Sequence, residues 1–543
     1  MKGSGRYEGY NIHSLRRDLI AGLIVGIVAI PLGMAFAIAS GVKPQYGIYT
    51  TIVAGILISL LGGSKFQIGG PTGAFIPILL AVVLQYGYDK LLLAGMMAGV
   101  ILVLMGLFRL GALIKFIPRP VTIGFTSGIA VIIFSGQIAN FLGLTGLERH
   151  EHFWPNMREL ATHLSSVNGY SVLTALISLA ILLLLPKRFP KLPASLIALL
   201  VSGVVASVFF GGKVATIGST YGDIPSTLPT FALPHISLDL IVELIRPALL
   251  IALLGGFESL LSAVVADGMS GSRHNSNREL IGQGIANFVT PLFGGIPATG
   301  AIARTATNIR SGAASPLSGV IHGLVVLLTL VLFAPFASDI PLSAMAPILM
   351  VVAWNMSERK EFMLVLGTRT GDSIVLVVTF LLTVFTDLTT AVEAGLAIAV
   401  LLFVKRISAN LVVAKEEHGS PELLVFSVEG PLFFGTASRL GAMIMAEAPH
   451  RPKALLLRME NVPYIDSSGE YVISTILRTY KQSGVLVLVS GIRPQPEAYL
   501  AKTGLDRILG KDRFFAHKEE AVRYALKALD RGEEAERREE VPV

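Results

Sequence analysis

Nearly continuous apolar stretches occupy the sequence from about residue 18 to residue 407, and only short loops separate them. A helix of roughly 20 apolar residues is long enough to cross the hydrocarbon core of a bilayer. Only 15% of all residues are charged, whereas soluble chains carry about 25%. Charged residues return in number after about residue 410. The chain is therefore predicted to be an α-helical membrane protein, with a transmembrane domain at 18–410 followed by a soluble domain.

The lengths of the apolar stretches predict fourteen membrane segments. Two of them, at 71–85 and 299–311, are too short to cross a bilayer alone. The others lie near 18–40, 46–62, 90–108, 120–139, 169–186, 192–211, 240–266, 279–294, 315–336, 341–355, 371–387 and 389–407. The polar N-terminus, residues 1–17, has no cleavable signal peptide, so we expect the first segment to stay in the protein.

Basic residues gather in every second loop of this arrangement. Arg16 and Arg17 precede the first segment, Arg109 follows the fourth, and Lys187 follows the sixth. By the positive-inside rule, this pattern predicts a cytoplasmic N-terminus and a cytoplasmic C-terminal domain on a protein of the cell inner (plasma) membrane. The net charge of +7 forms no continuous basic face, so we do not expect nucleic-acid binding.

The residue types in the sequence argue against an enzyme. Cysteine is absent from the sequence, which excludes disulfides, a thiol nucleophile and Cys-ligated metal sites. The sequence has no evident metal cluster, nucleophile–base pair or phosphate-binding loop. We therefore expect no catalytic residues, no metal site and no cofactor.

The two short segments open with a shared signature, PTGAF at 71–75 and ATGAI at 298–302, about 227 positions apart. The Ile-Pro pairs at 117–118 and 340–341 keep nearly the same offset. The segments thus form two halves, at about 18–211 and 240–407, with seven segments each. Because seven is odd, the halves enter the membrane in opposite directions, which predicts a seven-plus-seven inverted repeat with two half-helices.

Glycine and proline break the chain immediately before each short segment, at 69–71 and at 294–297. A broken backbone at membrane depth is tolerated only where protein or water satisfies its polar groups. A half-helix that begins there points its free N–H groups and positive dipole end into the membrane interior. Two such ends that face each other predict an anion site that needs few cationic side chains.

Two charged residues lie inside the predicted segments. Arg304 is one turn into the tenth segment, and Glu258 is in the eighth. Charges inside apolar spans are costly and are functional candidates by default. Burial favours the neutral form of a carboxyl group, so Glu258 is a candidate proton carrier. The structural alternatives are that Arg304 reaches the membrane interface, or that Arg304 and Glu258 form a permanent ion pair.

Several motifs together resemble the SulP family of anion transporters, which includes sulfate permeases, bicarbonate transporters and the motor protein prestin. The motifs are IPLGMAFA at 30–37, PQYGIY at 44–49, GPTGA at 70–74 and the run from Thr299 to Ala306. The resemblance implies a core domain of segments 1–4 and 8–11 and a gate domain of segments 5–7 and 12–14. It also implies that the core moves as an elevator against the gate, and we expect a homodimer.

The resemblance further implies a substrate site between the third and tenth half-helices. Its residues are expected to be Phe36, Thr72, Gly73, Ala74, Ala301, Ile302, Ala303 and Arg304. Glu258 matches the acidic position of the family, and Ser262 follows four residues on; the Glu favours coupling to protons over sodium, because sodium-coupled relatives have Asp there. Many relatives have Ser immediately before the arginine. Ala303 removes that hydroxyl donor and leaves the preferred oxyanion open.

The C-terminal region is predicted to be a small α/β domain at 421–530, because short apolar strands alternate with helical stretches. The motif VPYIDSSG at 462–469 resembles that of STAS domains, which share their fold with anti-sigma-factor antagonists. Ser467 corresponds to the phosphorylated serine of those antagonists. The alternative is that Asp466 and Ser467 only cap the following helix. The charged tail, 531–543, is predicted to be disordered.

The sequence as a whole favours a secondary active transporter of a small anion, such as sulfate, bicarbonate or a C4-dicarboxylate, by proton symport. One alternative is a passive anion channel or a sensor linked to the STAS domain. A second is a nucleobase transporter of the same architecture. A nucleobase carrier is expected to present polar or acidic side chains to the base edges, whereas Arg304 among small residues favours an anion.

Overall fold

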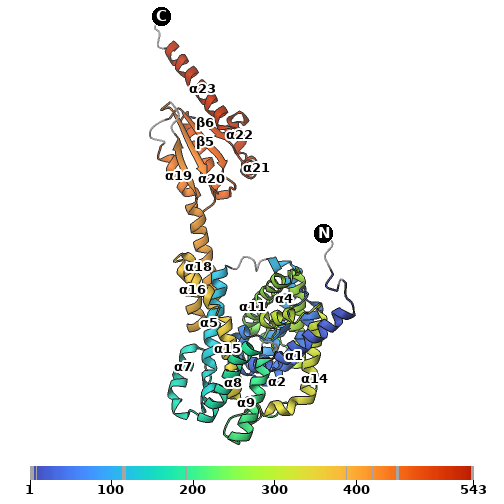
Figure 1. Cartoon of the computed structure of the whole chain (residues 1–543). Coiled ribbons are helices and arrows are strands. Elements are labelled where there is room, and N and C mark those ends of the chain that lie inside the picture. Colours follow the sequence, from blue (N-terminus) through green and yellow to red (C-terminus); the bar gives the residue numbers. More distant parts are fainter. Residues whose placement is uncertain are drawn as a thin grey trace. The chain divides into compact units, whose positions relative to one another are not determined.

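The computed structural model describes residues 5–7, 9–112, 118–189, 192–386, 388–416, 420–447 and 452–539. The chain divides into two compact units, Met1–Ala397 and Ile398–Val543, which we describe one at a time (Figure 1).

The first unit consists mainly of helices. Its first half contains α1 (Ile12–Ala39), α2 (Pro44–Leu61), the 3-10 turn η1 (Gly73–Phe75) with α3 (Ile76–Tyr86), α4 (Tyr88–Leu107), α5 (Arg119–Gly136), α8 (Gly169–Arg188) and α9 (Ala194–Phe210). Its second half contains α11 (Leu238–Ser270), α12 (Ser276–Val289), α13 (Ile302–Arg310), α14 (Leu317–Ser338), α15 (Leu342–Met356), α17 (Gly371–Phe385) and α18 (Leu388–Ala409), which continues into the second unit. Each predicted membrane segment coincides with one of these helices, which confirms the α-helical membrane fold.

Length and composition alone identify seven helices of the described chain that can cross a membrane. They are α1, α2, α4, α8, α11, α14 and the stretch Arg119–Leu142, which joins α5 to the short α6 (Ile138–Leu142). Three shorter apolar helices, Gly73–Tyr86, Ala194–Phe210 and Gly371–Phe385, stand among them. The first unit also contains short helices that the sequence did not predict, among them α7 (Phe153–Thr162), α10 (Ile217–Tyr221) and α16 (Arg359–Gly367).

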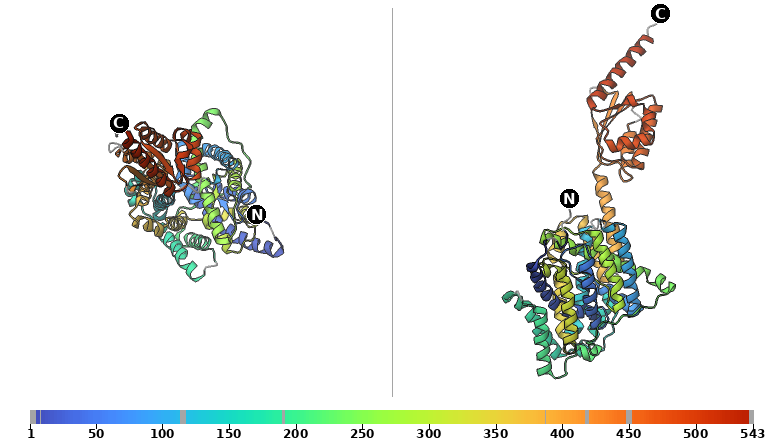
Figure 2. Two further views of the ribbon diagram at one scale, coloured as in Figure 1. Left: turned by 90° about the horizontal axis from the view of Figure 1, so that it is seen from above. Right: turned by 90° about the vertical axis from the view of Figure 1, so that its right-hand side faces the viewer.

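The helices of the first unit pack in two groups (Figures 1 and 2). In one group, α1 packs on α2 and α14, while α4 packs on α11 and α12. In the other, α5 packs on α15 and α17, while α8 packs on α9 and α15. The first group contains segments 1–4 and 8–11, and the second contains segments from 5–7 and 12–14. We call them the core group and the gate group.

The second unit is an α/β domain with a five-stranded sheet in the order β3-β4-β5-β6-β7. The strands are β3 (Val412–Glu416), β4 (Leu423–Glu429), β5 (Ala454–Asn461), β6 (Leu486–Ser490) and β7 (Phe514–Phe515). β3 is antiparallel to β4, and the other pairs are parallel. The helices are α19 (Ala437–Met445), α20 (Ser467–Gln482), α21 (Pro494–Lys502), α22 (Leu505–Leu509) and α23 (Lys518–Glu539).

Successive residues of β4 face opposite sides of this sheet. Leu424 and Phe426 belong to an apolar cluster with α20, whereas Leu423 and Val425 pack with α23. Helices therefore cover both faces, which explains why the central strands are apolar without alternation.

The ends of the second unit differ from the prediction. Its first strand, β3, begins at Val412, before the expected start at 421. The sequence did not predict this edge strand because it is short and half polar. α23 continues to Glu539, so the segment from 531 to 539, which we expected to be disordered, is helical. Acidic and basic residues spaced four apart in the sequence favour that helix. The rest of the predicted tail, residues 540–543, lies outside the described residues.

Candidate functional site

The two glycine-containing breaks meet inside the core group. β1 (Gly69–Gly70) pairs antiparallel with β2 (Thr299–Gly300), with Gly69 opposite Gly300. The N–H of Ala301 also donates a hydrogen bond to the carbonyl of Ile68 (2.8 Å). A Cβ at Gly300 would overlap the side-chain amide of Gln67, so the close approach requires glycine. The predicted meeting of the two half-helix starts is therefore confirmed.

Buried side chains from α11 and α13 hold this junction. The Ser259 hydroxyl accepts a hydrogen bond from the N–H of Gly300 (3.0 Å) and shares one with the Thr299 hydroxyl (2.9 Å). The Thr305 hydroxyl accepts a hydrogen bond from the N–H of Ile68 (3.0 Å). The segment that leads into β1 is thus tied to α13 of the second half, and β2 is tied to α11, which fixes where α3 and α13 begin.

A polar stripe on α12, which the sequence analysis missed, supports the loops before both half-helices. Asn287 accepts a hydrogen bond from the N–H of Ala298 and donates one to its carbonyl (2.8 Å each). The Glu279 carboxylate accepts hydrogen bonds from the N–H groups of Gly63 (2.7 Å) and Ser64 (2.9 Å). Glu279 and Asn287 are eight residues apart, so they lie on one helix face. The spacing of these two polar residues is the sequence feature that could have indicated a polar face on this helix.

Arg304 lies in the first turn of α13 and is only 2% exposed. Its Nη2 donates a hydrogen bond to the carbonyl of Pro71, just before η1. A Cβ at Gly70, whose φ is +149°, would contact Nη1 of Arg304. Among the described residues, Nη1 has no hydrogen-bond partner. The hypothesis that Arg304 reaches the membrane interface is therefore wrong, because its charge is held at the start of the other half-helix.

Glu258 and Ser262 lie on α11, close to this junction in sequence. Glu258 is 6% exposed and forms no hydrogen bond or ion pair with any residue that the structure describes. The alternative of a Glu258–Arg304 ion pair is therefore not observed. Ser262 is fully buried and donates a hydrogen bond to Thr305 (3.3 Å).

The other predicted site residues have different environments. Phe36, Thr72, Gly73, Ala74 and Ala301 are buried, Ile302 is half-buried and Ala303 is exposed. The Thr72 hydroxyl is buried without a hydrogen-bond partner in the described chain.

Gly73 lies where the core group meets the gate group. A Cβ at Gly73 would lie 3.0 Å from the sulfur of Met356 on α15 and 3.4 Å from a methyl carbon of Ile133 on α5. The start of the third half-helix therefore contacts two gate-group side chains, which the sequence analysis missed.

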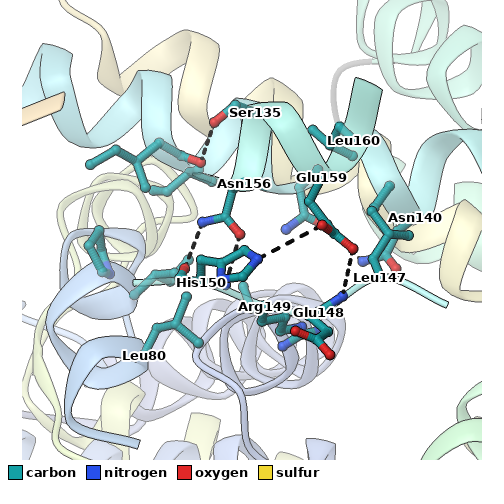
Figure 3. A pocket seen from close by; sticks show the side chains of 18 of the residues that line it. Leu80, Ser135, Asn140, Leu147, Glu148, Arg149, His150, Asn156, Glu159 and Leu160 are labelled. Carbon is teal, nitrogen blue, oxygen red and sulfur yellow. Dashed lines mark hydrogen bonds and ion pairs between the residues drawn. The ribbon is translucent and has the colours of Figure 1, made fainter. Parts of the chain in front are cut away.

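A cavity of 1010 Å³ lies between the two groups. At one end it is lined by Ile76 and Pro77 of α3 and by Ile133 of α5, next to Gly73. At the other end it is lined by the loop before α7 and by α7 itself (Figure 3). None of the predicted site residues lines this cavity.

The loop beside the cavity bridges the two groups. Arg149 donates a hydrogen bond to the carbonyl of Ile38, near the end of α1 (3.1 Å). Asn156 accepts a hydrogen bond from the N–H of His150 (2.9 Å) and donates one to its carbonyl (2.6 Å) (Figure 3).

In the second unit, Asp466 is the N-cap of α20. Its carboxylate accepts hydrogen bonds from the N–H groups of Ser468 and Gly469 (2.9 Å each) and of Phe434 (3.1 Å). Ser467 is exposed and lines a cleft of 360 Å³ with Phe434 and Tyr471. Capping by Asp466 is thus observed, and Ser467 is accessible.

Two half-helices that meet at a buried arginine inside one helix group, with a second group packed beside it, are typical of a membrane transport protein. The comparisons with known proteins specify which kind. The chain belongs to the sulfate permease family, whose model matches residues 15–379, and a STAS domain matches residues 413–521.

Two relatives span nearly the whole chain. "Putative sulfate transporter YvdB" of Bacillus subtilis is 55% identical over 529 residues, which cover 96% of this chain and 99% of that protein. The bicarbonate transporter BicA of Picosynechococcus sp. is 28% identical over 551 residues, which cover 95% of each chain. Both relatives are named as transporters and not as enzymes, in agreement with the expectation that the chain is not an enzyme.

Two solved structures resemble the fold. The transmembrane domain of a cyanobacterial BicA matches with a TM-score of 0.63 and 29% identity, over 72% of this chain and 98% of that one. The structure of SLC26A9 matches with a TM-score of 0.82 over 97% of this chain and 92% of that one. At 20% identity, the second likeness concerns the fold alone.

Proposed function

We propose that the protein is a secondary active transporter that binds a small anion where β1 and β2 meet. The observation that carries this proposal is the buried Arg304, whose Nη1 has no partner among the described residues. An uncompensated buried charge is costly, and an anion would remove that cost. The first N–H groups of η1 and α13 are further donors at the same place.

The site would be formed by Phe36, Thr72, Gly73, Ala74, Ala301, Ile302, Ala303 and Arg304. The unpartnered Thr72 hydroxyl offers a hydrogen bond to the anion. Sulfate is our first choice of substrate, because the relative with 55% identity is named for it. Bicarbonate, for which another relative is named, and C4-dicarboxylates are the other candidate substrates.

We assign proton coupling to Glu258, with Ser262 on the same helix. Glu258 is buried without a cationic partner in the part of the chain described, and binding a proton neutralises such a carboxylate. Sodium is our second choice of coupling ion, because Glu258 stands where the sodium-coupled relatives have Asp.

Transport would proceed by movement of the core group against the gate group, as an elevator. The contact of Gly73 with Met356 and Ile133 lies at the boundary that would slide. We place the protein in the cell inner membrane as a homodimer, with its N-terminus and STAS domain in the cytoplasm. Phosphorylation of the exposed Ser467 would be a means of regulation.

Uptake of radioactive sulfate into proteoliposomes tests this proposal. An inward proton gradient should concentrate sulfate, and Arg304→Ala should weaken sulfate binding by at least tenfold. Arg310→Ala is the matched control, because Arg310 is exposed at the other end of the same helix and should leave binding intact. Glu258→Gln should retain binding but lose the response to the proton gradient. Equal losses of sulfate binding in the two arginine variants would refute the site. Sulfate that equilibrates across the membrane without being concentrated would refute the coupling.

A further inference from the structure

A histidine is buried in the middle of the apolar helix α14. His322 is 0% exposed, and neither of its ring nitrogens has a hydrogen-bond partner among the described residues. Gly319 precedes His322 by one turn of α14. Buried polar groups are normally paired, so an unpaired imidazole in this position calls for an explanation.

The ring of His322 lies against the polypeptide that forms the junction. A Cβ at Gly55 of α2 would lie 2.9 Å from Cε1 and 3.2 Å from Nδ1 of His322. The same Cβ would lie 3.4 Å from the carbonyl oxygen of Gly69, in β1. The imidazole and β1 are therefore neighbours across Gly55, on the side of the junction where α2 and α14 pack together.

On the other side of Gly69, the guanidinium of Arg304 contacts Gly70 and Pro71 at the end of β1. The titratable and charged groups of α1 lie in its first two turns and are His13, Arg16, Arg17 and Asp18. Arg17 donates a hydrogen bond to the carbonyl of Gly312 (2.8 Å). On α1, the nearest carboxylate, Asp18, is bound to the N–H groups of residues 314 and 315.

The remaining elements that pack on α14 bring only tyrosines. α2 has Tyr46 and Tyr49 and no acidic, basic or histidine residue between Pro44 and Leu61. α10 contacts the far end of α14 and brings Tyr221. The charges of α1 thus lie near the start of that helix, whereas the charge at the end of β1 is that of Arg304.

We propose that His322 is a second proton-binding residue of the transport site and that it takes up a proton when an anion binds to Arg304. This inference rests on the proposed function. An imidazolium and an uncompensated guanidinium repel each other in an apolar core. A bound anion removes that repulsion, so a proton from water can add to the free ring nitrogen. The linkage is reciprocal: a proton on His322 strengthens anion binding to the same extent.

Equilibrium binding of radioactive sulfate to the purified full chain, measured as a function of pH, tests the inference. Sulfate stays a dianion across the neutral range, so any pH dependence belongs to the protein. With one proton taken up per anion, the dissociation constant should fall by about tenfold for each unit of decreasing pH within the coupled range. His322→Gln should abolish this slope, and His322→Asn should do the same.

Two further variants make the outcome specific. Val326→Ala shortens a fully buried side chain one turn further along α14. This variant should keep the pH dependence of sulfate binding even if its thermal stability falls. Glu258→Gln identifies any part of the slope that belongs to Glu258 and not to His322. A slope that survives in both His322 variants overturns the inference. A slope that is lost only in Glu258→Gln overturns the inference about His322 and leaves proton coupling by Glu258 intact. A wild-type chain that binds no sulfate counts against the proposed function itself.

Discussion

Replacing Ser259 with alanine removes the hydroxyl that holds β2 against α11. In the native chain this hydroxyl accepts a hydrogen bond from the N–H of Gly300 and shares another with Thr299. Thr299 keeps its hydrogen bond to the carbonyl of Gly255 (3.4 Å) in the variant, so the main loss is at Gly300. Its N–H is left buried without a partner, which costs about 1–3 kcal/mol.

The free energy lost at the Gly300 N–H also sets an upper limit on the effect on anion binding. If the orphaned Gly300 N–H displaces the start of α13 in the unliganded protein, sulfate affinity falls by up to about 5- to 150-fold. Thermal unfolding of the purified protein, with and without sulfate, measures both consequences. Ser202→Ala is the matched control, because Ser202 is also fully buried but has no hydrogen-bond partner in the described chain. Its replacement should be neutral or stabilising. Equal unfolding temperatures and equal affinities for the two variants would refute the role assigned to Ser259.

Two further predictions concern other parts of the chain. Asn287→Ala breaks both hydrogen bonds to Ala298 and should lower thermal stability by about 1–3 kcal/mol; expression and unfolding temperature equal to wild type would contradict it. In the second unit, the hydrogen bond from Lys518 lowers the pKa of Glu416 below its ordinary value of 4.5. Because a lowered pKa stabilises the fold above the unfolded value, acidification through that range should increase hydrogen exchange in β3, and Lys518→Met should weaken this pH dependence; an unchanged pH profile in Lys518→Met would count against it.

The helices of the first unit could be predicted from the sequence because a bilayer imposes a minimum apolar length on each crossing. The breaks at 69–71 and 294–297 were visible because Gly and Pro disrupt helices strongly. The positions of both half-helix starts followed from those breaks.

The supports of the site could not be predicted in the same way. Asn287, Glu279 and Ser259 contact backbone groups that are distant in sequence, and a single sequence does not say which buried polar residue meets which loop. His322 was missed because a lone histidine in an apolar run gives no sign of its neighbours. Short edge strands such as β3 were missed because five residues carry little periodicity.

Anomalous diffraction from crystals grown with selenate, a sulfate analogue, tests whether the junction of β1 and β2 binds the anion. We expect an anomalous peak between Thr72 and Ala301, within hydrogen-bond distance of Nη1 of Arg304. A peak confined to the cavity beside Arg149, with the junction of β1 and β2 empty at saturating selenate, would contradict it.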